Sequence, residues 1–147
     1  MAERPVDILL VEDSSSDEEL TLYALKAQNL AYDVMVVRDG AEALDFIFRI
    51  GAYAGLTGEN RPRLVLLDLK LPKVDGFEVL RILKEHPRTR TIPVVVLTSS
   101  NEERDIVESF RLGGNSYICK PVDFVQFGEV VRQVAEYWLL LNQPQLG

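Results

Sequence analysis

The stretch that decides the fold is LVLLDLKLPKVDG, residues 64–76, because an apolar run in it ends directly in a carboxylate. Residues 64–67 are Leu, Val, Leu and Leu, and Asp68 follows them with no turn residue between. A short apolar run without polar alternation is typical of a strand that is covered on both faces. The sequence therefore predicts a buried strand that carries an acid at its carboxyl end.

Five runs of this kind alternate along the chain with five amphipathic segments. Strict alternation of strands and helices predicts right-handed βαβ units around one parallel sheet. We therefore expect a flavodoxin-like (βα)5 fold, in which a doubly wound five-stranded parallel sheet forms the middle layer of a three-layer α/β/α sandwich. The predicted strands cover residues 7–11, 32–37, 63–68, 93–98 and 116–120, and the predicted helices cover 16–30, 40–50, 77–86, 102–112 and 124–141.

The first predicted helix has both a start signal and an apolar face. It begins in SSSDEE (14–19), which supplies hydroxyl caps and first-turn acids that suit the helix dipole. The residues Leu20, Tyr23, Ala24 and Ala27 recur at i, i+3, i+4 and i+7, so we expect this face to pack on the core.

Composition limits the class of protein. With 147 residues, 47% of them apolar, the chain is long enough for one globular domain with a real core. A net charge of −7 disfavours nucleic acid and anionic membranes as partners. The single cysteine, Cys119, allows no internal disulfide, and no run resembles a signal peptide or a membrane span. We therefore expect a cytoplasmic protein.

Polar and charged side chains follow four of the five predicted strands. Glu12 and Asp13 follow the first strand, Asp68 the third, Thr98 ends the fourth and Lys120 ends the fifth. The carboxyl ends of parallel strands meet at one edge of the sheet, where ligands of such folds bind. Acidic oxygens without a His or Cys cluster favour Mg²⁺. The sequence therefore predicts an oxygen-ligand metal site at this edge.

Lys120 beside these acids indicates that the site also receives an anion. A phosphoryl group can accept hydrogen bonds from the Lys120 ammonium and the Thr98 hydroxyl while a metal ion neutralises its other oxygens. Asp68, at the end of a central strand, is the best placed nucleophile. Each residue alone has an ordinary explanation as a strand-end or turn residue, and only their coincidence at one edge favours a function.

The motifs around these residues resemble those of the receiver domain of two-component response regulators, over about residues 6–138. The resemblance implies that Asp68 accepts a phosphoryl group from a sensor histidine kinase in a Mg²⁺-dependent reaction. Such a protein catalyses only its own phosphorylation and dephosphorylation, and is not an enzyme for other substrates. The matching segments are ILLVEDSSSDEELTLYAL (8–25), LVLLDLKLPKVDGFEVL (64–80), IPVVVLTSS (92–100) and SYICKP (116–121).

The resemblance also implies a set of metal ligands. Glu12 and Asp13 resemble the family's Mg²⁺-binding acids, and Asp68 joins them. The main-chain carbonyl of Lys70 falls where a further ligand is expected. Lys70, two residues beyond Asp68, also occupies a position that varies in the family and influences the phosphoryl lifetime, which the sequence leaves open.

The resemblance also implies roles in the conformational change that follows phosphorylation. Thr98 and Tyr117 resemble the hydroxyl and aromatic pair that rearranges on phosphorylation, and Lys120 resembles the phosphoryl-contacting lysine. The resemblance implies a cis bond between Lys120 and Pro121. Ser100, two residues beyond Thr98, is the second variable position that influences the phosphoryl lifetime.

GAYA (51–54) and EYWLLLNQP (136–144) resemble segments of the stand-alone regulators that are paired with bacterial phytochromes. These are single receiver domains that tend to dimerise, so we expect no output domain here and a signal that leaves through contacts with an unknown downstream protein. The expected organisation is one receiver domain over residues 1–147, with its core at 6–138, a long loop at 51–62 and a C-terminal helix extension at 139–147.

The last predicted helix is more apolar than one core stripe can bury. Four consecutive apolar residues at 138–141 must point some side chains outward, and such a patch usually marks a partner site. We expect a homodimer through the fourth and fifth helices and the fifth strand. The alternative is that the end of the last helix folds back over its own core.

Three other functions remain to be weighed. A Mg²⁺-dependent phosphatase of the haloacid-dehalogenase type needs a second Asp as general acid where this chain has Lys70. A nucleotide-binding flavodoxin-like domain needs glycines after the first strand, whereas residues 12–19 read EDSSSDEE and repel phosphate. A degenerate receiver that binds partners without phosphorylation is disfavoured because all the key residues are present.

Overall fold

The computed structural model describes residues 6–27, 32–55 and 61–145. Within them, five parallel strands form one sheet in the order β2-β1-β3-β4-β5. The strands are β1 (Ile8–Val11), β2 (Val34–Val37), β3 (Leu64–Leu67), β4 (Val94–Thr98) and β5 (Ser116–Cys119). The helices are α1 (Ser15–Lys26), α2 (Gly40–Phe48), α3 (Gly76–Glu85), α4 (Glu103–Arg111) and α5 (Phe124–Glu136), with a 3-10 turn η1 (Gly51–Tyr53) and a π-helical turn η2 (Tyr137–Leu141).

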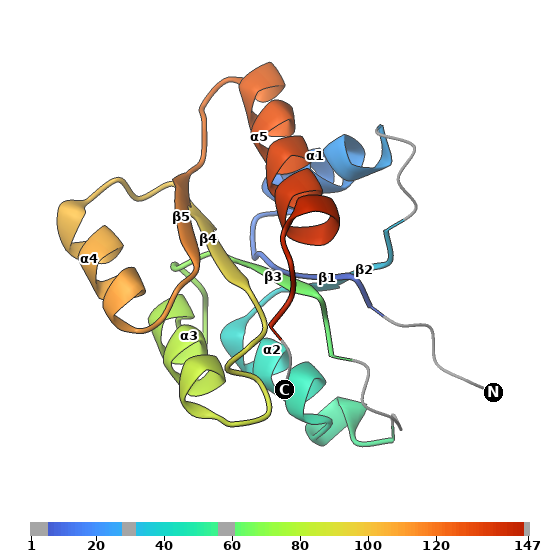
Figure 1. Cartoon of the computed structure of the whole chain (residues 1–147), viewed down its shortest axis with the longest axis vertical. Coiled ribbons are helices and arrows are strands. Elements are labelled where there is room, and N and C mark those ends of the chain that lie inside the picture. The colour runs from blue at the N-terminus through green and yellow to red at the C-terminus, as the bar shows by residue number, and fades with distance from the viewer. Residues whose placement is uncertain (1–5, 28–31, 56–60, 146–147) are drawn as a thin grey trace.

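The helices cover both faces of the sheet, which confirms the predicted three-layer sandwich. Helices α1 and α5 lie side by side on one face, and α2, α3 and α4 lie on the other (Figure 1). Every predicted strand and helix is present, with ends that differ by a few residues. Residues 28–30 of the predicted first helix and 56–60 of the predicted loop lie outside the described residues.

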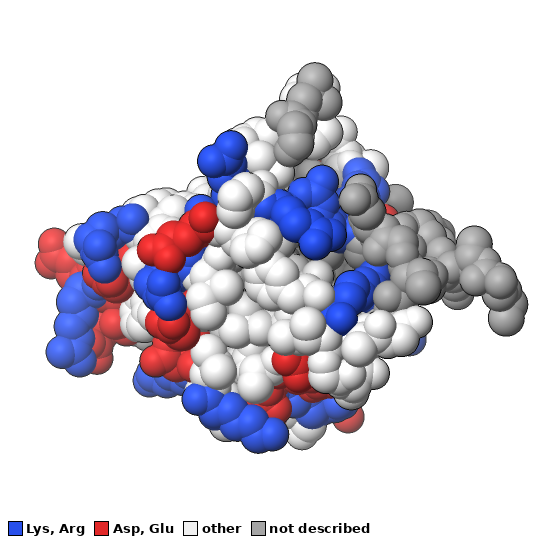
Figure 2. Space-filling view, turned by 90° about the horizontal axis from the view of Figure 1, so that it is seen from below, with Lys and Arg blue, Asp and Glu red and all other residues white. Residues whose placement is uncertain are grey.

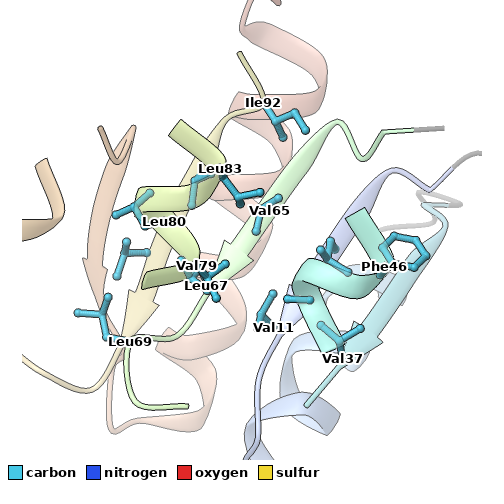
Figure 3. Packing of buried hydrophobic residues seen from close by; sticks show 14 residues of the cluster. Val11, Val37, Phe46, Val65, Leu67, Leu69, Val79, Leu80, Leu83 and Ile92 are labelled. Atoms are coloured by element: carbon cyan, nitrogen blue, oxygen red, sulfur yellow. The ribbon is translucent and has the colours of Figure 1, made fainter. Parts of the chain in front are cut away.

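Side chains on successive strand residues point to opposite faces, and this alternation builds two cores. On β1, Leu9 and Val11 belong to the core under α2 and α3, while Ile8 and Leu10 belong to the core under α1 and α5. Figure 3 shows the first of these, in which residues from α2 and α3 interdigitate with the sheet. Because both faces are covered, the strands contain no polar alternation, as the sequence indicated.

The register of the sheet decides which residues leave it together. Val11 pairs with Leu67, so the residues that follow them, Glu12 and Asp68, leave neighbouring strands at the same level. Thr98, the last residue of β4, pairs with Cys119, directly before Lys120. The predicted site residues are therefore delivered to one edge of the sheet by strand pairing alone.

The buried face of α1 differs from the predicted one. Thr21, Ala24 and Leu25 are buried, whereas Tyr23 is 66% exposed and Ala27 is exposed as well, so the prediction that Tyr23 and Ala27 pack on the core is wrong. Thr21 is tolerated inside because its hydroxyl donates to the Asp17 carbonyl at 2.8 Å. Periodicity alone did not predict which face of α1 is buried, because the contact with α5 decides which residues of α1 face inward.

The predicted last helix changes pitch after α5. The turn η2 buries Leu139 and packs Trp138 against the core under α1 and α5, and Arg63 Nη2 donates to the Leu139 carbonyl at 2.7 Å. Leu140 and Leu141 stay exposed. The segment thus covers part of its own core and still leaves an apolar surface. Neither α5 nor any other helix within the described ranges combines the length and apolarity needed to cross a bilayer.

The surface carries charges of both signs in close alternation. On α3, Arg81 pairs with Glu78 and Glu85, and on α4, Arg111 pairs with Glu108. On the face in Figure 2, acidic and basic side chains adjoin at the left and lower parts, while the upper part carries a group of basic side chains. Exposed pairs of this kind contribute little to stability, about 0–1 kcal/mol each. The net acidity of the chain is therefore not spread as a uniform field over this face.

Gly76 allows α3 to start directly against the end of β3. Its N–H donates to the Leu69 carbonyl at 2.9 Å, and a Cβ atom at this position would overlap the Asp68 carbonyl oxygen and the Leu69 Cα. We expect Gly76→Ala to lower the free energy of unfolding by about 1–3 kcal/mol, because the backbone must move. Urea unfolding measures this.

Gly55→Ala is the matched control, because a Cβ atom there meets nothing within 4 Å. Its effect should stay within about 0.5 kcal/mol. Equal stabilities for the two variants would contradict the tight contact at Gly76.

Candidate functional site

The ammonium group of Lys120 lies at the centre of the site. Its Nζ atom donates to Glu12 Oε1 at 2.6 Å, to Asp17 Oδ2 at 2.8 Å and to Asp68 Oδ2 at 2.8 Å. A lysine ammonium has three N–H donors, so each donor has one carboxylate partner. The Lys120 side chain is only 6% exposed, and burial strengthens these charged contacts. The three carboxylates raise the pKa of Lys120 although burial opposes the charge.

Asp68 is held as a carboxylate by donors on both of its oxygens. Besides Lys120 at Oδ2, the Thr98 hydroxyl donates to Oδ1 at 2.8 Å and the Lys70 backbone N–H donates to Oδ1 at 3.2 Å. Burial favours the neutral acid, but the Lys120 and Thr98 hydrogen bonds outweigh it and hold the pKa of Asp68 below its usual range. Asp68 is therefore ionised at neutral pH, as a nucleophile must be.

Glu12 behaves differently from Asp68 although both contact Lys120. Burial is the largest influence on Glu12, and the negative charge of Asp68 adds to it, so that the pKa of Glu12 is raised to about 7. The hydrogen bond from Lys120 and one from the Ser14 N–H lower it only in part. The site thus holds more acid than one lysine can neutralise, and a further positive charge would favour the ionised form of Glu12.

The acidic residues fit a divalent cation. Carboxylate oxygens of Glu12, Asp13 and Asp68 all lie within 4.8 Å of one another, with Asp13 on the exposed side. The donor set consists of oxygen atoms, which suits a hard cation that keeps several water ligands. Of the predicted ligands, Lys70 contributes its N–H to Asp68, and a role for its carbonyl stays a prediction.

The predicted switch residues lie next to this cluster. Thr98 is fully buried and bonded to Asp68, as described above. The Tyr117 side chain packs against the core under α2 and α3, and its hydroxyl donates to the Ser100 carbonyl at 2.7 Å. The Ser100 hydroxyl in turn donates to Asp105 Oδ2 at 2.5 Å. A chain of contacts therefore connects the β4–α4 loop to the edge strand β5.

The prediction for the bond between Lys120 and Pro121 is wrong, because the described residues contain no cis peptide bond. Bonds before proline favour the trans form by about 0.5–1 kcal/mol, and the trans form here still brings Lys120 to the acids.

Asp17 is the one contact of Lys120 that sequence reasoning missed. The sequence pattern indicated only that Asp17 is a first-turn acid that suits the helix dipole. The sequence signal for this contact is position: α1 begins a few residues after the site-bearing end of β1, and Asp17 lies in its first turn. A residue one turn into that helix can still reach the edge of the sheet.

Known proteins resemble this chain in both sequence and structure. The family model described as response regulator receiver domain matches residues 8–132. Response regulator Rcp1 from Synechocystis sp. is 40% identical over 135 residues, which cover 92% of this chain and 90% of Rcp1. The structure of the phosphorylated cyanobacterial phytochrome response regulator RcpA is 40% identical, with a TM-score of 0.89 over 97% of this chain and 100% of that one. The Mn²⁺-bound form of Rcp1 is 38% identical, with a TM-score of 0.88 over 97% and 100%.

These likenesses extend over nearly the whole chain, so they include the parallel sheet. The matched segment contains every residue that contacts the Lys120 ammonium. The chain therefore belongs to the response regulator receiver domain family of two-component signalling, and its similarity to Rcp1 and RcpA places it with the phytochrome-associated type.

Proposed function

We propose that this protein is a stand-alone response regulator that accepts a phosphoryl group from a sensor histidine kinase onto Asp68. The observation that carries the proposal is the convergence of an ionised, buried Asp68 with a lysine, a hydroxyl and two further acids at one edge of the sheet. In this proposal the chain acts as one receiver domain in the cytoplasm.

The proposed chemistry is the transfer of a phosphoryl group from a donor to the Asp68 carboxylate. One carboxylate oxygen of Asp68 forms a bond to phosphorus while the bond from phosphorus to the donor breaks, and the donor leaves with that electron pair. Lys120 and Thr98 already contact the Asp68 oxygens, so they are within reach of the transferred group. Attack of water on the same phosphorus later breaks its bond to the Asp68 oxygen, which releases inorganic phosphate and regenerates the carboxylate. In this proposal the protein catalyses only its own phosphorylation and dephosphorylation.

We infer that Mg²⁺ is the cation of this site. Glu12, Asp13 and Asp68 would hold it, together with the Lys70 carbonyl. When bound, Mg²⁺ supplies positive charge against the oxygens of the phosphoryl group. The close spacing of the three carboxylates supports this inference, as does the Mn²⁺-bound form of Rcp1.

The signal is proposed to leave through the face of α4 and β5. The Thr98 hydroxyl already donates a hydrogen bond to Asp68, and the Tyr117 hydroxyl already donates one to the Ser100 carbonyl. A phosphoryl group on Asp68 offers Thr98 further oxygens and so stabilises this arrangement over others, which is a population shift and not a new fold. The partners are a sensor histidine kinase of the bacterial phytochrome type and a downstream protein that reads this face.

A homodimer through α4, β5 and α5 is part of the proposal. Val107 and Phe110 on α4 and Tyr137 after α5 expose about half or more of their side chains. Large exposed apolar side chains usually mark a protein contact, and these lie on elements on either side of the edge strand β5 (Figure 1). Burial of this surface against a second copy would remove it from water.

The first test is the intact mass after incubation with Mg²⁺ and acetyl phosphate. The wild-type protein should gain one phosphoryl group, because Asp68 is ionised and surrounded by donors. Asp68→Asn and chelation of the metal should both abolish the gain. Glu19→Gln, an exposed acid on α1, is the matched control and should be phosphorylated like the wild type. An unchanged wild-type mass would favour a degenerate receiver.

The raised pKa of Glu12 predicts how stability depends on pH in metal-free buffer. Between pH 4.5 and 7 the folded state holds a proton on Glu12 that the unfolded chain has released. The free energy of unfolding should therefore fall as the pH rises through this window. Glu12→Gln should flatten this part of the curve, and Glu19→Gln should not. Urea unfolding at several pH values measures this pH dependence. A slope for Glu12→Gln equal to that of the wild type would contradict the prediction.

The dimer is tested by the dependence of molar mass on concentration in light scattering. Phe110→Glu introduces a charge into the proposed contact and should weaken dimerisation by about tenfold or more, equivalent to about 1.4 kcal/mol. Ile50→Glu is the matched control, because Ile50 is similarly exposed but follows α2. A wild-type protein that stays monomeric with and without phosphorylation would contradict the dimer.

A further inference from the structure

Asp17 is anchored so that its carboxylate faces Lys120. Its N–H donates to the Ser14 hydroxyl at 3.3 Å, and its carbonyl accepts from the Thr21 hydroxyl at 2.8 Å. Its Oδ2 atom lies 2.8 Å from Lys120 Nζ, and its side chain is 29% exposed. Both backbone groups are thus fixed by the first turns of α1, and the side chain is left to contact the lysine.

A helix-capping role does not account for this side chain. In a capping box, the acid three residues after the N-cap accepts from the N-cap N–H. Here the N-cap is Ser14, and its N–H donates to Glu12 Oε2 at 3.3 Å. Asp17 therefore occupies the capping position in the sequence, but its carboxylate is directed to a lysine 103 residues away.

Of the three carboxylates on Lys120, Asp17 is the one that the proposed chemistry leaves unchanged. Glu12 and Asp68 belong to the group of acids whose oxygens lie within 4.8 Å of one another, and Asp17 does not. A bound cation and a phosphoryl group on Asp68 would redirect Glu12 and Asp68 toward these new partners. The hydrogen bond from Lys120 to Asp17 can persist throughout.

We propose that Asp17 is a positioning residue that holds the Lys120 ammonium in place for phosphoryl transfer. This inference rests on the proposed function of the site. A lysine on a flexible stem binds phosphate as a point charge, so its effect depends on where the ammonium is held. Small displacements of catalytic groups can reduce a rate by up to about a hundredfold. Loss of the Asp17 carboxylate should therefore slow phosphorylation without removing any group that contacts the transferred phosphoryl.

The experiment measures the initial rate of phosphorylation of the full chain by acetyl phosphate at saturating Mg²⁺, followed by intact mass. Asp17→Ala should lower the rate about tenfold, and Asp17→Asn, which keeps an oxygen acceptor, should recover part of it. Glu19→Ala removes the same charge from an exposed position of α1 and should react like the wild type. Unfolding midpoints of all variants show whether each is folded at the assay temperature.

A double-mutant cycle separates positioning from a general charge or stability effect. If Asp17 acts through Lys120, Asp17→Ala should cause no further loss when Lys120→Gln is already present. An equal loss in both backgrounds would overturn the inference, and so would a rate for Asp17→Ala that matches Glu19→Ala. In either case the wild type is still phosphorylated, so the proposed function stands. Only a wild type that takes up no phosphoryl group would overturn both.

Discussion

The contact of one buried ammonium with three carboxylates is the interaction on which the site depends. Acids brought together in a partly buried place repel one another, and burial disfavours their ionised forms. Lys120 compensates for part of this charge, so Asp68 stays ionised at neutral pH. Burial raises the pKa of Glu12, which accepts fewer hydrogen bonds, so Glu12 is only partly ionised at neutral pH. The same excess of negative charge favours a cation beside Glu12, Asp13 and Asp68.

The rest of the fold serves to keep these charges at one edge. Parallel pairing in register brings Glu12 and Asp68 out of the sheet side by side, and the pairing of β4 with β5 brings Thr98 and Lys120 to the same level. Helices cover both faces of the sheet (Figure 1), and the polar groups of the site lie where the strands end. Gly76 then lets the chain turn into α3 in close contact with the backbone of Asp68.

Hydrogen bonds connect this end of the sheet to the surface of α4 and β5. Thr98 contacts Asp68, and the loop that follows it is tied to β5 through the hydrogen bond between Tyr117 and Ser100. Tyr117 lies on an edge strand, so only a few contacts separate Asp68 from the exposed face of α4 and β5. Sub-ångström shifts can be transmitted in this way because packed elements have discrete arrangements and do not deform continuously.

The sequence by itself determined the fold and most of the site. Alternating apolar runs and amphipathic segments specify a parallel sheet, and carboxyl ends of parallel strands meet, so Glu12, Asp13, Asp68, Thr98 and Lys120 were predictable from position alone. Only the tertiary structure decided that Asp17 joins them, that Tyr23 faces outward and that Glu12 and Asp68 differ in pKa. These properties depend on distances and burial between segments up to 108 residues apart, which no local pattern encodes.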